Sequence, residues 1–332
     1  MKPLVSIVMP CWNSVDTLPE CLDSILGQSY SEWEMIAVND GSKDRTEEVL
    51  ESYAERDSRI RVLSLAHSGI VKAPMLGVEL ASGEYLCRMD SDDIANPERL
   101  TRQAGYLESN PEIALCGSRV GHTGIEAGEG RLRYFEWINA ILEPEEVLRE
   151  LFVECPIPHP ASMMRREAFD AVGGYLDFGW AEDYDLIMRF AEAGFGMANV
   201  DSELLWWRHS EGRISMNDAR YSLEQFRNLK RHYLAKMYLD SRLEFYQWGA
   251  GEVGKTWLRE WGDRRPEAVV DIAPRKIGKT IHGTLVIAPD DLPKPGNGFT
   301  VVAVGAPGAR EEIREWFVSR GYVECVDFLF LA

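Results

Sequence analysis

Short apolar runs and amphipathic stretches alternate along the first hundred residues of the chain. The run Val5–Met9 suits a buried strand, and the next stretch carries apolar residues at helical spacing between Leu18 and Leu26. This helix is predicted to begin at Thr17–Glu20, which has the spacing of a capping box. Three more strand-like runs follow, separated by helix-like stretches: 34–38, 61–65 and 84–89. The alternation predicts an α/β fold with a mostly parallel sheet flanked by helices.

Polar residues follow the apolar runs at the points where strands are expected to end. Asn13 comes after the first run, Asp40 after the second, and Asp90, Ser91 and Asp92 after the fourth. In open α/β sheets, ligands bind at the carboxyl ends of the strands. We therefore expect these side chains to converge on one ligand crevice.

The rest of the chain has a less regular pattern that restarts near its end. We expect an exposed Gly-rich loop at 121–130, a non-helical Pro-rich segment at 156–160 and a helix at 181–193. A basic helix at 220–236 has two interpretations, a solvated face or a surface for anionic membranes. A strand at 245–248 restarts the strand–turn–helix order, so we place two domains at 1–242 and 243–332.

Composition narrows the classes of ligand. The 332 residues are 45% hydrophobic, enough for a substantial buried core, and carry a formal net charge of −18. Such a charge argues against nucleic acid as a partner, because phosphate backbones are held by clusters of Lys and Arg. An acidic protein that binds an anion must concentrate positive charge locally, and a divalent cation is the simplest means.

Cysteine spacing and hydropathy favour a cytoplasmic protein. The six cysteines are scattered without CxxC spacing, which indicates neither a zinc site nor a disulfide framework. The first apolar run is too short for a signal peptide, and no run approaches the roughly 20 residues that cross a bilayer. Peripheral contact with the inner face of a membrane stays open.

The triplet Asp90-Ser91-Asp92 is the strongest local indication of chemistry. Two carboxylates after a strand end can hold Mg²⁺ or Mn²⁺ against a diphosphate, because these hard cations prefer oxygen ligands. Acidic triplets also cap helices, and Asp93 before Ile94 suits that structural role equally. The triplet alone does not decide between them.

The order of motifs adds the missing context. Four segments stand in sequence: Val5-Ser6-Ile7-Val8-Met9-Pro10-Cys11-Trp12-Asn13, Ser24-Ile25-Leu26-Gly27-Gln28, Val38-Asn39-Asp40-Gly41-Ser42, and Gly83-Glu84-Tyr85-Leu86-Cys87-Arg88-Met89-Asp90-Ser91-Asp92-Asp93. Over roughly residues 4 to 240, this combination resembles the family 2 inverting glycosyltransferases. The resemblance implies a GT-A fold and the transfer of a sugar from a nucleotide diphosphate donor to an acceptor hydroxyl.

The resemblance also implies a donor site. Pro10, Trp12 and Asn13 match the first nucleotide-binding segment, in which the Trp12 ring would stack on the base. Asp40 matches the carboxylate that accepts from uracil N3–H, which favours a UDP-sugar, although an Asp here also suits a simple turn. Asp90 with Ser91 matches the donor-binding position. The pair Asp90 and Asp92 would hold Mn²⁺ or Mg²⁺.

The acceptor side follows from three later segments. Asp183 matches the family's general base, which must take the proton of a hydroxyl with a very high pKa, and Glu182 would position it or contact the acceptor. An acidic helix start is the structural alternative for this pair. His159, in Pro158-His159-Pro160, matches an acceptor-side segment, although a structural role is the other interpretation.

A late element and one departure complete the predicted site. Arg208 and His209 match an element in which the His completes the metal shell and the Arg faces the diphosphate. A surface histidine is the alternative for His209. The chain departs from the family at Pro74-Met75, which removes a polar contact to the donor, and Lys72 could substitute by reaching a phosphate.

The C-terminal segment carries the glycine pattern Gly249-x-Gly251-x-x-Gly254 after a predicted strand. Asp271 follows some 17 residues later, close to a dinucleotide-binding arrangement. The segment resembles small Rossmann-like modules of bacterial sugar-modifying enzymes, and half a dinucleotide fold makes NAD binding doubtful. Packing, oligomerisation and ligand sensing are the favoured roles.

Three functions are compatible with these patterns. The first is an inverting, metal-dependent transferase that uses a UDP-sugar and a glycan or lipid-linked acceptor in bacterial surface polysaccharide or glycoconjugate synthesis. The second is an NAD-dependent oxidoreductase that uses the C-terminal glycines. The third is a nucleotide-sugar sensor with a decayed donor site, which Pro74-Met75 suggests.

Overall fold

A computed structural model describes most of the chain, and its residues form two compact units. The described residues are 2–125, 128–209, 218–240 and 244–332. The first unit comprises Met1–Val147 with Pro156–Phe226, and the second comprises Leu148–Cys155 with Arg227–Ala332. Each unit has its own sheet and its own hydrophobic core.

The first unit is built on an eight-stranded sheet in the order β3-β2-β1-β4-β7-β6-β8-β5. Its strands are β1 (Val5–Cys11), β2 (Trp33–Asp40), β3 (Ile60–Leu65), β4 (Tyr85–Arg88), β5 (Ile94–Ala95), β6 (Ile113–Gly124), β7 (Met163–Arg165) and β8 (Gly196–His209). Strands β1 to β4 are parallel, β7 is antiparallel to both neighbours, and β6 runs parallel to β8. The sheet is therefore mostly parallel, as predicted.

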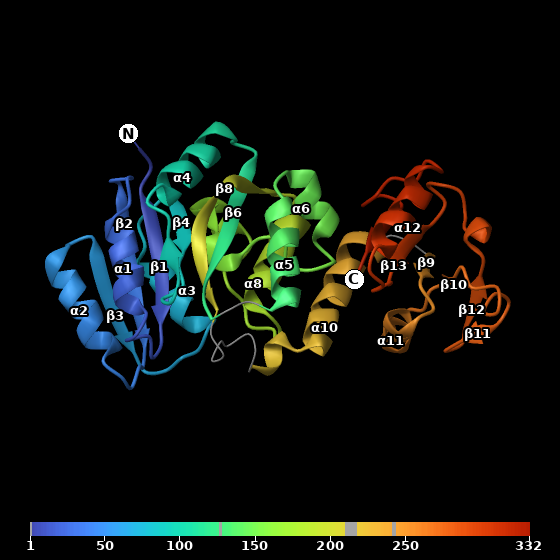
Figure 1. The fold of residues 1–332 in the computed structure, drawn as a ribbon, viewed down its shortest axis with the longest axis horizontal. Helices are drawn as coiled ribbons and strands as arrows, with labels where there is room; N and C mark the ends of the chain where they lie inside the picture. Colours follow the sequence, from blue (N-terminus) through green and yellow to red (C-terminus); the bar gives the residue numbers. More distant parts are fainter. Residues whose placement is uncertain (1, 126–127, 210–217, 241–243) are drawn as a thin grey trace. The chain divides into compact units, whose positions relative to one another are not determined.

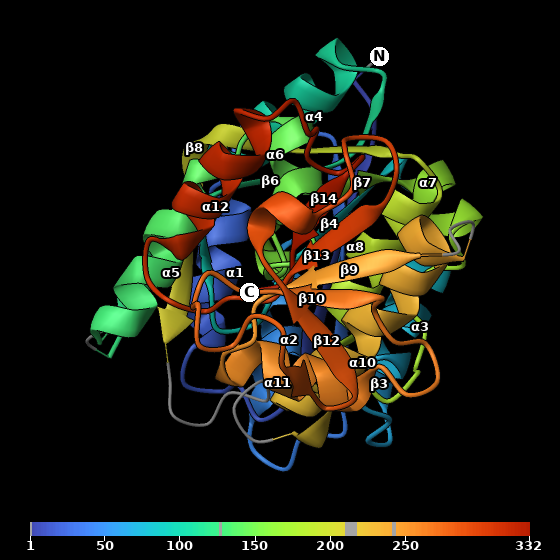
Figure 2. The same cartoon turned by 90° about the vertical axis from the view of Figure 1, so that its right-hand side faces the viewer.

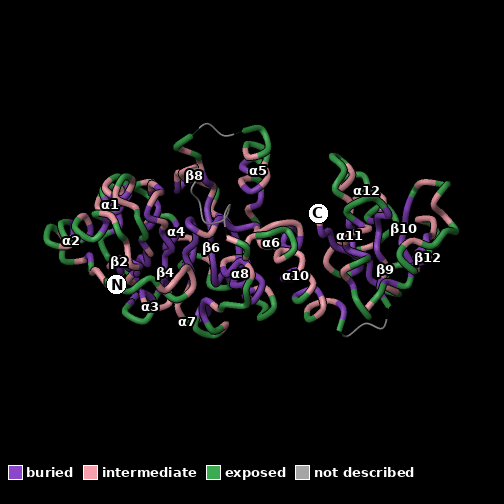
Figure 3. Tube along the Cα trace, turned by 90° about the horizontal axis from the view of Figure 1, so that it is seen from below, coloured by how far each residue is buried: buried purple, intermediate pink, exposed green. Residues whose placement is uncertain are grey.

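Helices cover both faces of this sheet. Figures 1 and 3 place α1 (Leu18–Leu26) and α2 (Thr46–Arg56) on one face and α3 (Lys72–Leu80) on the other. The remaining elements are α4 (Arg99–Ser109), α5 (Glu129–Ala140), α6 (Pro144–Glu150), η1 (His159–Ala161), α7 (Arg166–Ala171), α8 (Glu182–Glu192), η2 (Ala219–Tyr221) and α10 (Leu223–Leu234). Figure 3 shows the buried residues concentrated in the strands and on the inner sides of the helices. Successive residues of a strand point to opposite faces of the sheet, so each strand contributes side chains to the apolar layer on both faces.

Two local predictions need correction. The first helix begins at Leu18 as expected, but Thr17 makes no side-chain cap; its hydroxyl donates to Ser14 O and Ser91 O instead. The stretch expected as an exposed loop is only partly one, because β6 continues to Gly124 and α5 begins at Glu129. Pairing with β8 keeps Gly121–Gly124 in the sheet.

The second unit has a six-stranded sheet in the order β11-β12-β10-β9-β13-β14, shown face-on in Figure 2. Its elements are η3 (Ala235–Leu239), β9 (Phe245–Trp248), α11 (Glu252–Glu260), β10 (Ala268–Val270), β11 (Thr280–Ile281), β12 (Thr284–Ile287), η4 (Pro289–Asp291), β13 (Phe299–Val302), α12 (Ala309–Val318) and β14 (Phe328–Phe330). All neighbouring strands are parallel except the pair β11 and β12.

The second unit begins earlier in the chain than residue 243. Lys230, in the last part of α10, donates to Val153 O at 2.7 Å and to Leu331 O at 3.3 Å. These bonds join the last two thirds of α10, residues 227–234, and the short segment 148–155 to the C-terminal residues. The predicted division after residue 242 therefore differs from the two units by these pieces. Among the described residues, none of the helices combines the length and apolar character that crossing a bilayer requires.

Candidate functional site

The loops after β1, β2 and β4 are tied together at the carboxyl edge of the first sheet. Asn13 has a positive φ of 50° and joins two of these loops, because its N–H donates to Ser42 Oγ at 3.0 Å and its Oδ1 accepts from Lys43 N at 2.8 Å. The hydroxyls of Ser14 and Ser91 lie 2.7 Å apart and join the first loop to the acidic loop. The strand ends therefore converge as the sequence predicts.

Asp40 lies at the end of β2, and its buried carboxylate is held by the loop after β3. The carboxylate accepts from Ser68 N at 2.6 Å, Ser68 Oγ at 2.8 Å and Gly69 N at 2.9 Å. Nδ1 of His67 lies 2.9 Å from Oδ2. Asn39, not Asp40, makes the local turn contact, since its Oδ1 accepts from Ser42 N. Asp40 therefore organises a distant loop.

Trp12 offers an exposed aromatic face beside Asp40. The residue is 47% exposed, and its ring stacks on His67 with the centroids 5.2 Å apart and the planes at 28°. Pro10 is half-buried near the end of β1. Sequence reasoning missed His67 and Ser68; the only available indication was their position directly before Gly69, in the segment that departs from the family pattern.

Arg88 fixes Asp90, the first carboxylate of the acidic loop. Nε and Nη2 of Arg88 both lie 2.8 Å from Asp90 Oδ1, and Arg88 is only 7% exposed. Two contacts from one guanidinium to the same oxygen hold that carboxylate more firmly than one contact does. Sequence reasoning missed Arg88 because it lies inside the strand, where a buried charge is uncommon.

Arg99, in α4, joins the acidic loop to the segment that carries His159. Its Nη2 donates to Arg88 O at 2.7 Å and to Pro160 O at 2.8 Å, and its Nε donates to Gln103 Oε1 at 3.0 Å. Arg99 is 1% exposed. A buried guanidinium requires such complete hydrogen bonding, so this residue is a positioning element of the site.

Arg208 holds the acidic loop from the side of β8. Its backbone N–H donates to Asp93 Oδ1 at 2.7 Å, its Nε donates to Asp92 O at 2.6 Å, and its Nη2 pairs with Glu20. His209 is the last residue of β8 and pairs in register with Gly124. The structure thus brings Arg208 to the predicted loop, with its guanidinium engaged by that loop.

His159 is neutral and bound to a tyrosine. Its Nε2 lies 2.8 Å from Tyr175 Oη. Burial, helped by the nearby charge of Arg88, lowers the pKa of His159 to about 3. The imidazole therefore carries no charge at neutral pH and acts only as a hydrogen-bonding group.

The acidic pair opens α8. Glu182 Oε2 accepts from Tyr221 Oη at 2.8 Å, and burial together with the charge of Asp183 raises the pKa of Glu182 to about 8. Asp183 is half-buried, and its Oδ1 accepts from Tyr184 N at 2.7 Å. The charge of Arg88 acts on Glu182, so the acidic pair and Asp90 share one guanidinium neighbour. Tyr221 was not predicted, because it follows the pair by 39 residues.

The departure at Pro74-Met75 has a packing explanation. Pro74 is buried in the first turn of α3, where a missing backbone N–H costs nothing. Met75 Sδ accepts from Tyr175 N at 3.2 Å. Lys72 is exposed at the first position of the same helix.

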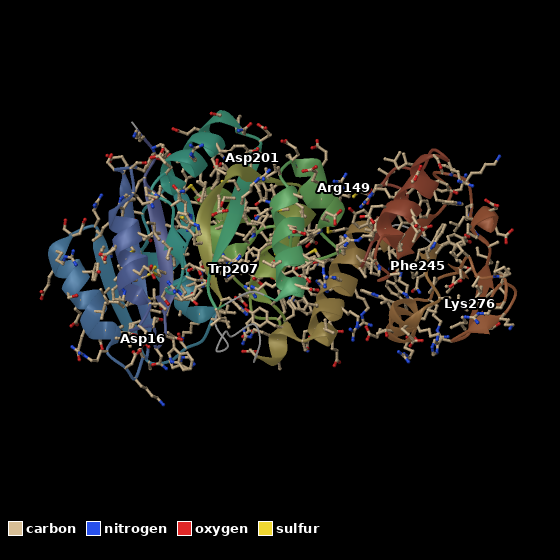
Figure 4. The ribbon with its side chains drawn as sticks, viewed as in Figure 1. Asp16, Arg149, Asp201, Trp207, Phe245 and Lys276 are labelled. Atoms are coloured by element: carbon tan, nitrogen blue, oxygen red, sulfur yellow. The ribbon has the colours of Figure 1, made fainter. Side chains whose placement is uncertain are left out.

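The C-terminal glycines form a tight turn, and Asp271 is held by neighbouring residues. Gly249 has a φ of 117°, and a Cβ on Gly254 would lie 1.9 Å from Gly249 O. Asp271 accepts from Ala250 N at 3.2 Å and from Lys276 Nζ at 2.7 Å; Lys276 is labelled in Figure 4. The acidic residue of the dinucleotide-binding arrangement is therefore already bound by neighbouring residues of the chain.

The residue types at the acidic loop suit a hard divalent cation. Asp90 and Asp92 offer carboxylate oxygens on one short loop, and Asp90 is oriented by Arg88. Across the part of the chain that the structure describes, no cluster of three or more His, Cys, Asp or Glu side chains could hold a metal ion. A cation here would need oxygens from a ligand in addition to these two residues.

Comparison with known proteins gives one consistent family. The sequence model of the family described as "Glycosyl transferase family 2" matches residues 6–173. An uncharacterized glycosyltransferase of Haemophilus influenzae is 29% identical over 73% of this chain and 77% of its own. A glycosyltransferase named EpsE from Bacillus subtilis is 30% identical over 67% and 79%. The amylovoran biosynthesis glycosyltransferase AmsE of Erwinia amylovora is 28% identical over 61% and 75%.

Two solved structures share the fold. Residues 1–349 of TarS from S. aureus, in complex with UDP-GlcNAc, match with a TM-score of 0.57 and 22% identity over 70% of this chain and 66% of that chain. The mannosyltransferase PcManGT from Pyrobaculum calidifontis, in complex with GDP-Man and Mn²⁺, matches with a TM-score of 0.52 and 15% identity over 72% and 71%.

Proposed function

Because the chain belongs to glycosyltransferase family 2 and has the GT-A fold, we propose that it transfers a sugar from a UDP-sugar to an acceptor hydroxyl with inversion. The carrying observation is that charged groups from the end of β4 and from the start of α8 act on one another. Arg88 links these two segments, since it pairs with Asp90 and its charge acts on Glu182.

Uracil suits the features around Asp40. Trp12 has an exposed ring for stacking, and Asp40 offers a carboxylate to a base N–H once a contact of the 67–69 loop is exchanged. TarS, which shares the fold, binds UDP-GlcNAc in its crystal structure, and this supports a UDP-sugar donor. The name of AmsE supports a role in bacterial surface polysaccharide synthesis.

The reaction is a single displacement at the anomeric carbon. Asp183 accepts the proton of the acceptor hydroxyl as its oxygen bonds to the anomeric carbon, and the bond from that carbon to the UDP oxygen breaks. Glu182 keeps its own proton at neutral pH and leaves Asp183 as the base. Attack from the side opposite UDP inverts the configuration.

Asp90 and Asp92 would hold Mn²⁺ or Mg²⁺, with His209 as a further candidate ligand. PcManGT was solved in complex with GDP-Man and Mn²⁺, which supports a divalent cation. When bound, the cation would neutralise charge on the diphosphate. Arg88 and Arg208 hold the acidic loop in place through Asp90 and the backbone oxygen of Asp92.

Replacing Asp183 tests the assignment of the base. Asp183→Asn should lower the turnover number for sugar transfer by roughly 10²–10⁴-fold, because an amide cannot take the proton. Calorimetric titration with UDP and Mn²⁺ should give an unchanged dissociation constant. Asp201→Asn is the matched control, since Asp201 is an exposed carboxylate paired with Arg119. Full turnover in Asp183→Asn would reject the assignment.

A further inference from the structure

A short aromatic segment directly precedes the acidic pair. Asp177 Oδ1 accepts from Gly179 N at 3.1 Å, and Gly179 has a φ of 82°, so the chain turns sharply at this point. The turn leaves Phe178 53% exposed. Few apolar rings on the described surface are this exposed, and an exposed apolar group beside a reaction centre suggests a contact made by a ligand.

Trp180 is the aromatic residue of this segment whose side chain is held by a hydrogen bond. Its Nε1 donates to Asp185 Oδ1 at 2.9 Å, and the fully buried Asp185 pairs through Oδ2 with Arg189 Nε at 2.8 Å. The Phe178 and Trp180 rings lie 5.4 Å apart with their planes at 34°. The exposed ring is therefore supported by an anchored one, so that a ligand meets a partly preorganised surface.

Arg220 supplies a hydrogen-bond donor near the same segment. Its charge acts on Glu182 and on Asp177. Its Nη1 is buried and has no hydrogen-bond partner among the residues that the structure describes. A guanidinium nitrogen in this state is expected to bind an oxygen when one is offered. The next residue, Tyr221, donates to Glu182.

We propose that Phe178, Trp180 and Arg220 form the acceptor subsite and that the acceptor group bound there is a neutral sugar ring. The inference rests on the proposed function, which requires a hydroxyl beside Asp183. A sugar ring has an apolar C–H face that suits Phe178 and hydroxyl oxygens that suit Arg220. A lipid phosphate fits less well, because the charge of Arg220 is already paired with Asp218 and also acts on Asp177, and these carboxylates would repel an anion.

Saturation-transfer NMR with methyl glycosides of glucose, galactose, mannose and N-acetylglucosamine tests the subsite. The full chain is held with UDP and Mn²⁺, so that the donor site is filled and no turnover occurs. We expect saturation of the ring protons of at least one glycoside. Phe178→Ala should weaken its binding by on the order of 10-fold, a typical size for a stacking contact, whereas Phe178→Tyr should retain it.

Leu223→Ala is the matched control, because Leu223 is 77% exposed in the same unit and lies outside the subsite. Its glycoside binding should equal that of the wild type. Hydrolysis of UDP-glucose and UDP-N-acetylglucosamine by water should also be unchanged in Leu223→Ala, which shows that this control keeps an intact donor site.

Three outcomes would overturn the proposal. They are glycoside binding that is equal in wild type and Phe178→Ala, an absence of glycoside binding while UDP-sugar hydrolysis persists, and binding of a polyprenyl phosphate in place of every glycoside. Failure of the wild type to bind UDP or to hydrolyse any UDP-sugar is a different result. It would refute the proposed function and the subsite with it.

Discussion

Neighbouring side chains at this site are pushed toward different protonation states by their surroundings. His159 is neutral because burial and Arg88 oppose its positive charge, and Glu182 holds a proton because burial and Asp183 oppose its negative charge. Both shifts leave these two side chains uncharged at neutral pH. The half-buried Asp183 is thus left as the carboxylate suited to accept a proton.

The pKa of Glu182 has a consequence for stability. The folded protein holds this proton up to about pH 8, whereas an ordinary Glu releases it near 4.5. Between these values the folded state binds more protons than the unfolded state, so stability falls as pH rises. Glu182→Gln cannot ionise and still accepts from Tyr221. Its free energy of unfolding relative to wild type should therefore increase from pH 5 to pH 8, by at most about 1.4 kcal/mol per pH unit, and its melting temperature should rise relative to wild type over the same range.

Thermal unfolding followed across this pH range measures the difference. Glu192→Gln is the control, since Glu192 is exposed near the other end of α8. Parallel pH curves for wild type and Glu182→Gln would contradict the raised pKa.

At the scale of elements, close packing at one glycine fixes the turn after β9. A Cβ on Gly254 would meet Gly249 O at 1.9 Å, and backbone cannot move aside as a side chain can. We expect Gly254→Ala to lower the free energy of unfolding of the second unit by about 3 kcal/mol. Gly251→Ala is the control, because nothing lies within 4 Å of its Cβ position and its φ of −86° suits alanine. Urea unfolding followed by tryptophan fluorescence measures both; equal midpoints would refute the expectation.

Hydrophobic periodicity predicted the elements well where one face of a helix is buried or where a whole strand is buried. The runs that became β1 and β2 and the helix α1 lie where expected, because alternating or helical spacing matches one buried face. The capping box failed because Thr17 and Glu20 found tertiary partners in Ser91 and Arg208. Local spacing contains no information about such distant competitors.

The same limit applies to the site. Asp40 and Asp90 could be placed from their positions at strand ends, and motif order supplied Asp183. His67, Tyr221 and Arg99 could not be found, because each makes a contact with a residue far away in sequence: His67 with Asp40, Tyr221 with Glu182 and Arg99 with Pro160. The first unit was thus predictable in outline, whereas the contacts that hold its side chains in place required the structure. The second unit also takes in 148–155, which no linear pattern predicts.

At the scale of the whole molecule, the two units offer two different nucleotide hypotheses that one experiment separates. UDP with Mn²⁺ should raise the melting temperature by several degrees, since a ligand at 100 times its dissociation constant stabilises by about 2.7 kcal/mol. NAD should give no shift, because Asp271 is occupied by Ala250 N and Lys276. Differential scanning fluorimetry with each ligand decides; a shift with NAD alone would favour the oxidoreductase hypothesis.

Arg99 couples the loop after β4 to the segment that carries His159, because one of its nitrogens binds both. Nη2 of Arg99 donates to the backbone oxygens of Arg88 and of Pro160. A displacement of either segment would therefore lengthen the hydrogen bond to the other. A substitution that changes the conformation of one segment should therefore also change the conformation of the other. On the proposed function, substitutions in the acidic loop that alter donor specificity should therefore also alter the segment that carries His159.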